Sequence, residues 1–526
     1  MKEKIAIWGT GNVCEQIMNG GKAVEPDCFI DNDVRKVGKE IYGVTIVHPS
    51  QITDWNELFV ILALDSYIGI RSQLIGYGLA EYEDFIWYRE WLCGKSAEQI
   101  VEEAEDFLDK IEWNQNYSGA GMIFSDFLAF DKGVCDFVNR WCSYGKRLVL
   151  LSEAACVSRE RMDKMLLPII ELPTALLRNQ YLKKQNGKFF FRHMTSYVSA
   201  KRYLRDAAGN LRMGYSDMAE NYEFMVCYYA DRIVRKIIEC WKPSQVILWN
   251  AFYAFHFIIR NICAEKRISV RFMEFGNIPG TIIVEKLGQM GESWPARHPQ
   301  EFVKISVSDK ERADAEKLIR RLRRNGLNRN TQPQNGILPE IAKRLKSGRP
   351  VVFYAGQNDN ASGMQPYTEN TQKFHSPIFR TSDEAAVFLA KVCERNDLNY
   401  IYKPHPMMAG NCDSSVLPKS VIFVEEADIN GLIDMSDVVV TILSTVSYVA
   451  LIRQKPVVML GYTQLKKQGC VYEAFDVRDI ERVLLDAIKN RLNEDMRHGF
   501  IAHIARMRRF YSGGIVGKRR EIRMSE

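Results

Sequence analysis

The residues best suited to chemistry stand together where the chain reads Lys403-Pro404-His405-Pro406, directly after the apolar run 400–402. Proline fixes its own backbone angle and restricts the residue before it, so two prolines in three residues make a rigid, extended turn. Open α/β sheets bind ligands at the carboxyl ends of their strands. A lysine ammonium and an imidazole held there suit the phosphate of a nucleotide. The alternative interpretation is a proline-rich loop whose histidine caps a helix.

Two more strands in the same region are expected to end in polar residues. The strand expected at 351–355 ends at Gly356, which opens a turn, and the polar cluster after it suits a sugar or a phosphate. The strand at 437–440 leads to hydroxyls at a helix start, where free amides and the helix dipole favour a phosphate, although an ordinary helix cap is the alternative. Ser382 is expected to cap a helix over 382–392. The candidate donor-binding residues are Gln357, Asp359, Lys403, Pro406, Glu425, Glu426, Ser444, Thr445 and Ser447.

The middle of the chain offers a candidate catalytic carboxylate. A strand expected at 270–274 ends in Glu274, and Gly276 follows two residues later. A carboxylate at a strand end beside glycine is a common arrangement for a general base or nucleophile with room for a bulky substrate. The alternative is a turn acid that caps the next element. Asn250, Gly276 and Ser293 are the candidate acceptor or cleft residues.

The N-terminus carries part of a nucleotide-binding fingerprint. A first strand is followed by two closely spaced glycines, and a second strand ends in an acid that could hold a ribose. The third glycine of the fingerprint is replaced by Cys14, and the domain is short for a dehydrogenase, so hydride transfer is disfavoured. A purely structural appendage is the other interpretation. The candidate nucleotide-binding residues here are Gly9, Gly11, Asn12 and Asp31.

Composition places the chain among ordinary globular proteins. Its 526 residues are 46% hydrophobic and 26% charged, which excludes disordered and fibrous classes. The net charge of +6 is small for this length and no aromatic-basic motif accompanies it, so nucleic acid is not an expected partner. Twelve cysteines without a Cys-x-x-Cys pair are typical of reduced thiols in a cytoplasmic protein. No apolar run approaches the roughly 20 residues of a membrane span, and we expect no signal peptide.

The positions of the strands and helices predict how the chain is divided. Alternation of strands and helices predicts three parallel α/β sheets, and the acidic stretch near residue 100 predicts a solvated connecting helix. Helix is also expected over 484–510, ahead of a basic end. The predicted organisation is a small Rossmann-like domain at 1–95, an acidic linker helix at 96–117, a first domain at 118–324, a linker at 325–349, a second domain at 350–490, and a C-terminal helix and basic tail at 491–526.

The order of these motifs resembles the capsule polysaccharide biosynthesis family, whose members include bacterial transferases of Kdo (3-deoxy-manno-octulosonic acid). The resemblance covers residues 120–490. The first 95 residues resemble the small nucleotide-sugar-binding domains that are appended to sugar acyltransferases. The matching motifs are Glu274-x-Gly276 with Pro279, Gly288, Gly291 and Ser293, Gln357-x-Asp359 with Ser362, Lys403-Pro404-His405-Pro406, and Ser444-Thr445 with Ala450-Leu451 and Lys455-Pro456.

The resemblance implies a GT-B-like pair of Rossmann-like domains that face each other across a cleft, with a nucleotide-sugar donor held mainly by the second. It implies that His405 binds or protonates the leaving phosphate and that Glu274 is a base or nucleophile. Ser444 and Thr445 would hold the phosphate. The implied reaction transfers Kdo or another CMP-activated acid sugar to a glycan or lipid-linked acceptor. No metal-binding Asp-x-Asp is apparent near the proposed site, so we expect transfer without a metal or other cofactor.

Two departures leave the identity of the donor open. Glu285 stands where the family pattern leads us to expect aspartate, and Gly363-Met364 replaces a more polar continuation. The Lys-Pro-His-Pro and Ser-Thr motifs also resemble the polymerases that transfer glycerol phosphate from CDP-glycerol. A third hypothesis is a non-catalytic protein that binds a nucleotide-sugar or a glycan. The basic C-terminal end suggests a peripheral contact with anionic lipid, close to a lipid-linked acceptor.

Overall fold

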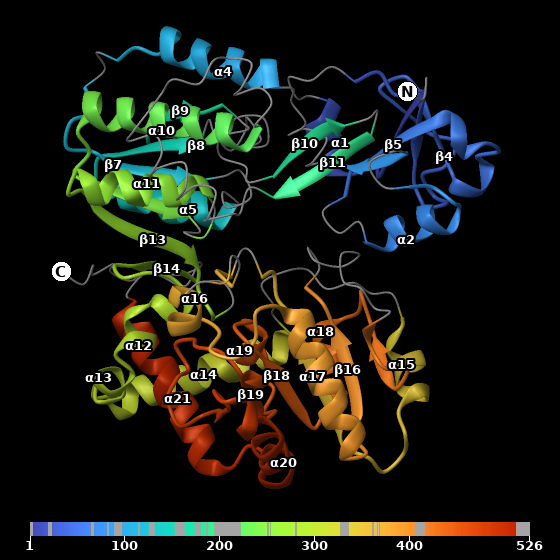
Figure 1. The fold of residues 1–526 in the computed structure, drawn as a ribbon, viewed down its shortest axis with the longest axis vertical. Coiled ribbons are helices and arrows are strands. Elements are labelled where there is room, and N and C mark those ends of the chain that lie inside the picture. The colour runs from blue at the N-terminus through green and yellow to red at the C-terminus, as the bar shows by residue number, and fades with distance from the viewer. Residues whose placement is uncertain are drawn as a thin grey trace. The chain divides into compact units, whose positions relative to one another are not determined.

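The structure is a computed structural model, shown in Figure 1. It describes residues 4–18, 24–64, 68–80, 84–88, 97–113, 116–125, 132–152, 164–173, 180–185, 188–193, 222–249, 252, 254–278, 281–326, 336–359, 362–364, 367, 369–405 and 416–511. The candidate residues Asn250 and Pro406 lie outside the described residues, as does the basic tail after residue 511. The chain divides into two compact units, Met1–Ile247 with Tyr253–Ser269, and Leu248–Phe252 with Val270–Glu526. The predicted domain boundaries stay predictions.

The N-terminal sheet is a small doubly wound α/β sheet. Its strand order is β3-β4-β2-β1-β5-β6, and the central strand β1 pairs in parallel with β2 and with β5. Most apolar residues of β1 and β5 are buried, which explains why both strands are apolar along nearly their whole length. The elements are β1 (Lys4–Trp8), α1 (Asn12–Met18), β2 (Cys28–Ile30), β3 (Glu40–Ile41), β4 (Val44–Val47), β5 (Leu58–Leu62), α2 (Ile68–Gly76) and β6 (Phe85–Trp87).

A second sheet has the order β14-β13-β12-β7-β8-β9. The described pairs β7 with β8 and β8 with β9 are parallel, whereas β13 and β14 form an antiparallel hairpin at one edge. Strands β10 (Gln180–Gln185) and β11 (Lys188–His193) form a separate antiparallel pair. The other elements are α4 (Ala97–Lys110), β7 (Gly121–Ser125), α5 (Lys132–Ser143), β8 (Leu148–Ser152), β9 (Ile169–Glu171), α10 (Tyr222–Trp241), β12 (Gln245–Trp249), α11 (Ala254–Glu265), β13 (Ser269–Phe275) and β14 (Ile282–Glu285).

The acidic helix α4 is more than a solvated connector, and that part of the prediction was wrong. Ala104 is fully buried, and the carboxylate of Glu105 accepts a 3.0 Å hydrogen bond from the hydroxyl of Tyr229 on α10. The guanidinium of Arg232, also on α10, forms an ion pair with the same carboxylate. Glu102 and Asp106 are exposed, whereas Ala104 and Glu105 lie on the side of the helix that packs on α10.

The C-terminal sheet, in the lower part of Figure 1, has the order β17-β16-β15-β18-β19-β20 and is parallel throughout. The first strand, β15, lies in the middle, and the order reverses between β15 and β18. The predicted class, two Rossmann-like α/β domains preceded by a small α/β domain, is confirmed at the level of these three sheets. The strands are β15 (Val351–Ala355), β16 (Asn399–Lys403), β17 (Val421–Phe423), β18 (Val438–Thr441), β19 (Val457–Met459) and β20 (Tyr472–Glu473).

Alternate residues of the C-terminal sheet enter two separate apolar cores, because neighbouring side chains of a strand point to opposite faces. Phe353 and Ile401 join the core formed with α14, α18, α19 and α21, while Tyr354 and Tyr402 join the core formed with α17 and α20. The helices are α12 (Trp294–Arg297), α13 (Pro299–Val303), α14 (Asp309–Asn325), α15 (Leu338–Arg344), α16 (Glu369–Phe374), α17 (Ser382–Arg395), α18 (Ile429–Met435), α19 (Val446–Ile452), α20 (Ile480–Asn490) and α21 (Glu494–Phe510).

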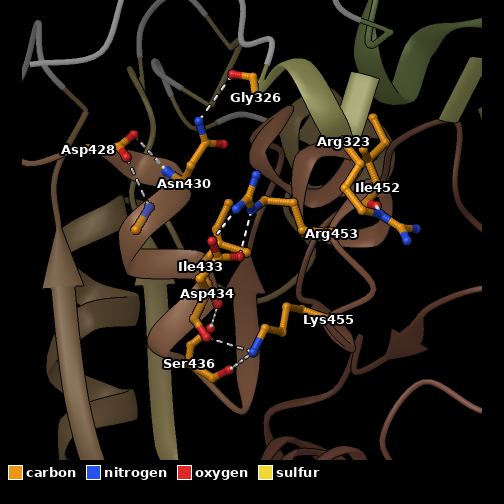
Figure 2. A network of polar contacts seen from close by, with 11 residues as sticks. Arg323, Gly326, Asp428, Asn430, Ile433, Asp434, Ser436, Ile452, Arg453 and Lys455 are labelled. Atoms are coloured by element: carbon orange, nitrogen blue, oxygen red, sulfur yellow. Dashed lines mark hydrogen bonds and ion pairs between the residues drawn. The ribbon is translucent and has the colours of Figure 1, made fainter. Parts of the chain in front are cut away.

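Polar contacts brace the helices on the first of these faces, as Figure 2 shows. The Lys455 ammonium donates to the carbonyls of Asp434 and Ser436, at 2.8 Å each, and thus covers the C-terminal end of α18. Arg453 forms a two-pronged ion pair with the carboxylate of Asp434. The described contacts of Lys455 are therefore with the end of a helix.

The C-terminal helical stretch is two helices, not one. Helix α20 ends before Arg491, which has a positive φ of 53°, and Asn493 caps the start of α21 by accepting from the backbone amide of Met496 at 2.9 Å. A residue with positive φ cannot continue a right-handed helix. The hydrophobic periodicity continues across this break, which explains why the sequence predicted a single element over 484–510.

Candidate functional site

Three neighbouring strands bring the candidate donor residues to one edge of the C-terminal sheet. Lys403 of β16 pairs with Ala355 of β15, and Tyr354 of β15 pairs with Val440 of β18. Strands β16 and β18 flank β15, so their carboxyl ends are about 10 Å apart at the same level. His405 and the hydroxyls after β18 therefore lie at one sheet edge, on either side of β15. This is the switch point at which doubly wound sheets bind ligands.

Gly356 and Gln357 close the end of β15. The amide of Gly356 donates to the carbonyl of Lys403 at 2.9 Å, and a Cβ at Gly356 would lie 3.1 Å from the Cα of Pro404. The side-chain oxygen of Gln357 accepts a 2.7 Å hydrogen bond from the amide of Leu443, which follows β18. Gln357 is 4% exposed and therefore joins the two strand ends from within. Its observed role is to hold the ends of β15 and β18 together.

Asp359 is bound to the start of helix α17. Its carboxylate accepts from the amide of Ser382 at 2.9 Å and from the hydroxyl of Ser382 at 2.7 Å. Burial raises the pKa of Asp359 to about 6, although these hydrogen bonds favour the charged form. The prediction that Ser382 caps α17 was wrong, because Thr381 accepts from the amide of Glu384 in that role. Ser382 instead holds Asp359.

Lys403 is buried beneath the turn that it begins. Its ammonium donates to the carbonyls of Glu425 at 3.1 Å and Pro404 at 3.4 Å, and the residue is 7% exposed. Burial lowers the pKa of Lys403 to about 8, against the attraction of Glu426 and Glu425. Lys403 thus ties the end of β16 to the end of β17. Glu425 and Glu426 are half-buried beside it, and His405 is half-buried two residues later.

The hydroxyls after β18 organise the turn into α19. The Ser444 hydroxyl accepts from the amide of Val446 at 3.3 Å, and the Ser447 hydroxyl donates to the carbonyl of Ser444 at 2.9 Å. Ser447 is 1% exposed, whereas Ser444 and Thr445 are half-buried. Thr445 is the cap residue of α19, and its side chain makes no capping hydrogen bond. Ser444 and Thr445 therefore have the accessibility that a ligand requires, and Ser447 does not.

Glu274 lies in the antiparallel hairpin of β13 and β14, where it pairs with Ile283 and is half-buried. Gly276 begins the turn that follows, and its amide donates to the carbonyl of Thr281 at 2.8 Å. A Cβ at Gly276 would lie 2.1 Å from the Thr281 hydroxyl oxygen, so the turn accepts only glycine there. The side chain of Asn277 in this turn donates to the side chain of Gln464, which follows β19. The Glu274 hairpin is thereby tied to the C-terminal sheet.

The segment after β14 is built around a buried carboxylate. Glu285 is 3% exposed and accepts from the amide of Lys286 at 2.7 Å and from the amide of Trp294 at 3.1 Å. The hydroxyl of Tyr511, directly after α21, donates to Glu285 at 2.7 Å. Ser293 is fully buried, and its hydroxyl donates to the carbonyl of Met290 at 2.6 Å. Ser293 therefore closes a turn, and its observed contacts are structural.

Sequence reasoning missed a buried pair, His375 and Glu292. The imidazole Nε2 of His375 lies 3.8 Å from a carboxylate oxygen of Glu292, and the two side chains are 3% and 13% exposed. The ring of Phe252 packs edge-on against His375, with 5.1 Å between the ring centroids. The signal available in the sequence was the pair of glycines before Glu292, because Gly291 packs directly on the carbonyl of Phe374.

In the N-terminal sheet, the predicted residues meet at the ends of β1 and β2. The carboxylate of Asp31 accepts from the Thr10 hydroxyl at 2.5 Å and from the Lys36 ammonium at 2.8 Å. Gly9 has a φ of 107°, and a Cβ there would lie 2.7 Å from the carbonyl oxygen of Ala63. Its glycine is thus required by strand packing. Gly11 has open space around it, and Asn12 begins α1.

Comparison with known proteins supports the assignment of the C-terminal sheet. Residues 363–475 match the family model described as capsule polysaccharide biosynthesis protein. The resemblance predicted from the motifs is confirmed over that segment, which contains Lys403, His405 and Ser444, while Glu274 and Gln357 lie outside it. Residues 1–84 match the family described as C2185-like, N-terminal. No curated protein matches the chain.

Solved structures with a similar fold include glycosyltransferases. A KpsC β-Kdo 2,7 transferase from Thermosulfurimonas dismutans is 16% identical, with a TM-score of 0.35, over 52% of this chain and 80% of that one. The β-Kdo 2,4 transferase KpsC of the same organism is 15% identical, with a TM-score of 0.36, over 51% and 80% of the two chains. A glycosyltransferase from Rickettsia africae is 9% identical, with a TM-score of 0.32, over 74% and 93%.

Two features of the described residues concern membranes and metal ions. None of the described helices has both the length and the apolar character that crossing a bilayer requires. Among the same residues, no three histidine, cysteine, aspartate or glutamate side chains gather closely enough to hold a metal ion. Transfer without a metal and contact with anionic lipid both stay predictions.

Proposed function

We propose that the protein is a glycosyltransferase of surface polysaccharide synthesis that takes its sugar from a nucleotide donor bound at the carboxyl ends of β15, β16 and β18. The observation that carries this proposal is the match of residues 363–475 to the capsule polysaccharide biosynthesis family, at the segment that forms this edge. The sheet register supports it, because Lys403, Ala355 and the residues after Val440 lie at one level.

The proposed roles follow the accessibility of the side chains. His405, Ser444 and Thr445 are half-buried and would contact the donor phosphate, while the buried Gln357, Asp359 and Lys403 hold the strand ends in place. The bond from the anomeric carbon to the phosphate oxygen breaks, and its electron pair leaves with the nucleotide. The acceptor hydroxyl bonds to the sugar and gives up its proton, for which Glu274 is the proposed base; a nucleophilic Glu274 is the alternative.

The proposed donor is a CMP-linked acid sugar such as CMP-Kdo, and the proposed acceptor is a glycan or a lipid-linked glycan. No metal or other cofactor is part of the proposal. The hydrogen-bonding groups at this edge support the proposal, since an imidazole and hydroxyls at a helix start suit a phosphate. A second nucleotide-binding site is proposed at Gly9, Gly11, Asn12 and Asp31.

The test is release of nucleotide from CMP-Kdo, CMP-sialic acid and CDP-glycerol by the full chain. We expect release from a CMP-sugar and a loss of at least about 100-fold in His405→Ala, since phosphate stabilisation of this kind is worth several kcal/mol. His298→Ala is the matched control, because His298 also precedes a proline but begins the short helix α13. Release from CDP-glycerol alone would instead identify a glycerol phosphate transferase. Binding of nucleotide without any release would show a binding protein.

A further inference from the structure

The hairpin that carries Glu274 has a second carboxylate on the same face. Glu274 of β13 pairs with Ile283 of β14, and Phe272, two residues earlier, pairs with Glu285. Directly paired side chains point to the same side of a sheet, as do residues two apart in one strand, so these four side chains share one face. Ile283 belongs to the core that α14, α18, α19 and α21 form with the C-terminal sheet. Glu285 is thus a diagonal neighbour of Glu274, about 7 Å away on the face that packs on that core.

Glu285 is held by hydrogen bonds from two parts of the chain. It is 3% exposed, and its carboxylate accepts from the amides of Lys286, Leu287 and Trp294, in the segment after β14. The hydroxyl of Tyr511 donates to the same carboxylate at 2.7 Å and comes from 226 positions further along the chain. The bond from Tyr511 therefore joins the hairpin to the end of α21.

The end of α21 is itself fixed to the segment after β14. The ring of Phe510 stacks on the ring of Trp294, with 5.0 Å between the centroids and 22° between the planes. Two guanidiniums of the last turns of α21 donate to backbone carbonyls that follow α13, Arg506 to Ile305 at 3.1 Å and Arg509 to Ser306 at 3.0 Å. Tyr511 is therefore presented to Glu285 by a helix end that has several anchors.

The hydroxyl of Tyr511 keeps its proton and so remains a donor. Burial raises the pKa of Tyr511 well above its usual value, and the negative charges of Glu285 and Glu274 raise it further. The influence of the Glu274 charge agrees with the strand register, which brings both carboxylates to the face that Tyr511 contacts. A hydrogen bond from a hydroxyl to a buried carboxylate is among the stronger kinds, and its loss would leave the charge less well compensated.

Such a bond does more than attach a helix end. Two apolar side chains of similar shape would attach it about equally well, since replacing both partners of a buried hydrogen bond can be nearly neutral for stability. A hydrogen bond to a charge adds a fixed direction and distance. The hairpin turn has a separate attachment, in which the side chain of Asn277 donates to that of Gln464. Loss of the Tyr511 hydroxyl should therefore displace β14 without releasing the hairpin.

We propose that Tyr511 is a positioning residue, which fixes β14 through Glu285 and thereby holds Glu274 in place on the paired strand. This inference rests on the proposed transferase function, in which Glu274 is the base. Tyr511 does not touch the donor or the acceptor in this proposal. Its effect on the reaction passes through the hairpin.

The first test is Tyr511→Phe, which removes the hydroxyl and keeps the ring. We expect kcat with the CMP-sugar to fall about 10-fold, since small misplacements of a reacting group cost one to two orders of magnitude. The KM for the CMP-sugar should stay within about 2-fold, because the donor site is unchanged. Tyr472→Phe is the matched control, since the hydroxyl of Tyr472 donates to the carbonyl of Arg491, just ahead of α21, at 2.7 Å. It should leave kcat and KM unchanged.

A second pair of variants separates positioning from a general loss of folded protein. If Tyr511 acts through Glu274, Tyr511→Phe should change the residual kcat of Glu274→Gln by less than about 2-fold, because coupled residues are not additive. A purely structural role would lower kcat by the same factor in both backgrounds. That result would overturn the proposal.

A third measurement does not need activity. Amide hydrogen exchange in β14 should be about 10-fold faster in Tyr511→Phe than in wild type and unchanged in Tyr472→Phe, since a hydrogen bond to a charged group is lost only in the first. Exchange in β15 should be the same in all three proteins and reports on the C-terminal sheet. If no CMP-sugar is turned over but exchange behaves in this way, the transferase proposal fails and the role of Tyr511 in fixing the hairpin stands. Equal exchange of β14 in wild type and Tyr511→Phe would overturn that role whatever the activity.

Discussion

The N-terminal and C-terminal sheets each have a carboxylate near the end of a strand, but the partners and the pKa of the two carboxylates differ. Asp31 in the first sheet faces the ammonium of Lys36, and Asp359 in the second accepts from the amide and the hydroxyl of Ser382. Burial acts on both carboxylates. At Asp31 the hydrogen bonds from Lys36 and Thr10 outweigh burial and lower the pKa, whereas at Asp359 burial prevails and raises it.

The difference shows that polar residues at the strand ends of the two sheets have different roles. In the C-terminal sheet, the buried Gln357 and Lys403 are bonded to neighbouring strand ends, whereas the candidate residues His405, Ser444 and Thr445 are half-buried. In the N-terminal sheet, Asp31 forms an ion pair with Lys36 that is partly open to solvent. A ligand there would have to compete with Lys36 or make use of its charge.

The largest expected effect on the free energy of unfolding is at Asp359. The folded-state pKa of about 6 lies above the unfolded value, so the folded state binds more protons between pH 4 and 6 and loses about 3 kcal/mol of stability as pH rises through that window. Asp359→Asn keeps one acceptor and one donor for Ser382 and should remove this loss. Urea unfolding of the C-terminal sheet at pH 4 and pH 7 checks it. A wild type that becomes more stable than the variant as pH rises would contradict the raised pKa.

The next largest effect on stability is expected at the glycines that follow the central strands β1 and β15, and it should differ between the two. Gly9→Ala should destabilise the N-terminal sheet by about 2 kcal/mol, because positive φ is strained for alanine and the new Cβ would contact the carbonyl of Ala63. Gly356→Ala should cost about 1 kcal/mol in the C-terminal sheet, since its neighbours must move only slightly. Amide hydrogen exchange in β1 and β15 measures each sheet separately. The reverse order would show that the two strand ends are not packed as described.

A smaller effect of opposite sign is expected at Asp31. Its folded-state pKa is lowered, so its contribution to stability is present above the unfolded pKa and is lost as pH falls through the folded one. Asp31→Asn should destabilise the N-terminal sheet at pH 7 by about 1 kcal/mol, because the partner Lys36 is partly exposed, and should have no effect at strongly acidic pH. Thermal unfolding at the two pH values gives the answer. Equal losses at both would show that hydrogen bonding alone is involved.

The smallest expected effect is at Gly11, which has open space around it and no positive φ. Gly11→Ala should change stability by less than about 0.5 kcal/mol, as surface substitutions do. If residues 9–12 bind a phosphate through close backbone approach, the same variant should weaken nucleotide binding in calorimetry. Unchanged binding of the nucleotides that the wild type binds would remove Gly11 from the proposed site. A substitution at Gly11 therefore tests nucleotide binding without a large change in stability, which a substitution at Gly9 does not.

Much of the architecture could be predicted from the sequence. The strands of all three sheets are short apolar runs such as 351–355 and 437–440, bounded by glycine, proline or polar residues. Apolar runs and the turn-forming residues that bound them are local properties of the chain. The Lys403-Pro404-His405 turn was identified for the same reason. What failed were assignments that depended on a neighbour distant in sequence, such as the buried face of α4 against α10 and the role of Ser382 in holding Asp359.

The sequence by itself determined the order of strands and helices, the glycines and prolines that end them, and the family resemblance of residues 363–475. Only the tertiary structure decided which polar residues are accessible, because burial depends on packing between segments far apart in the chain. Gln357 and Lys403 are polar in sequence but lie inside, bonded to Leu443 and Glu425. His375 and Glu292 are separated by more than 80 positions, and no local pattern relates them. Their contact exists because two glycines let one loop pack against another, which only the folded chain reveals.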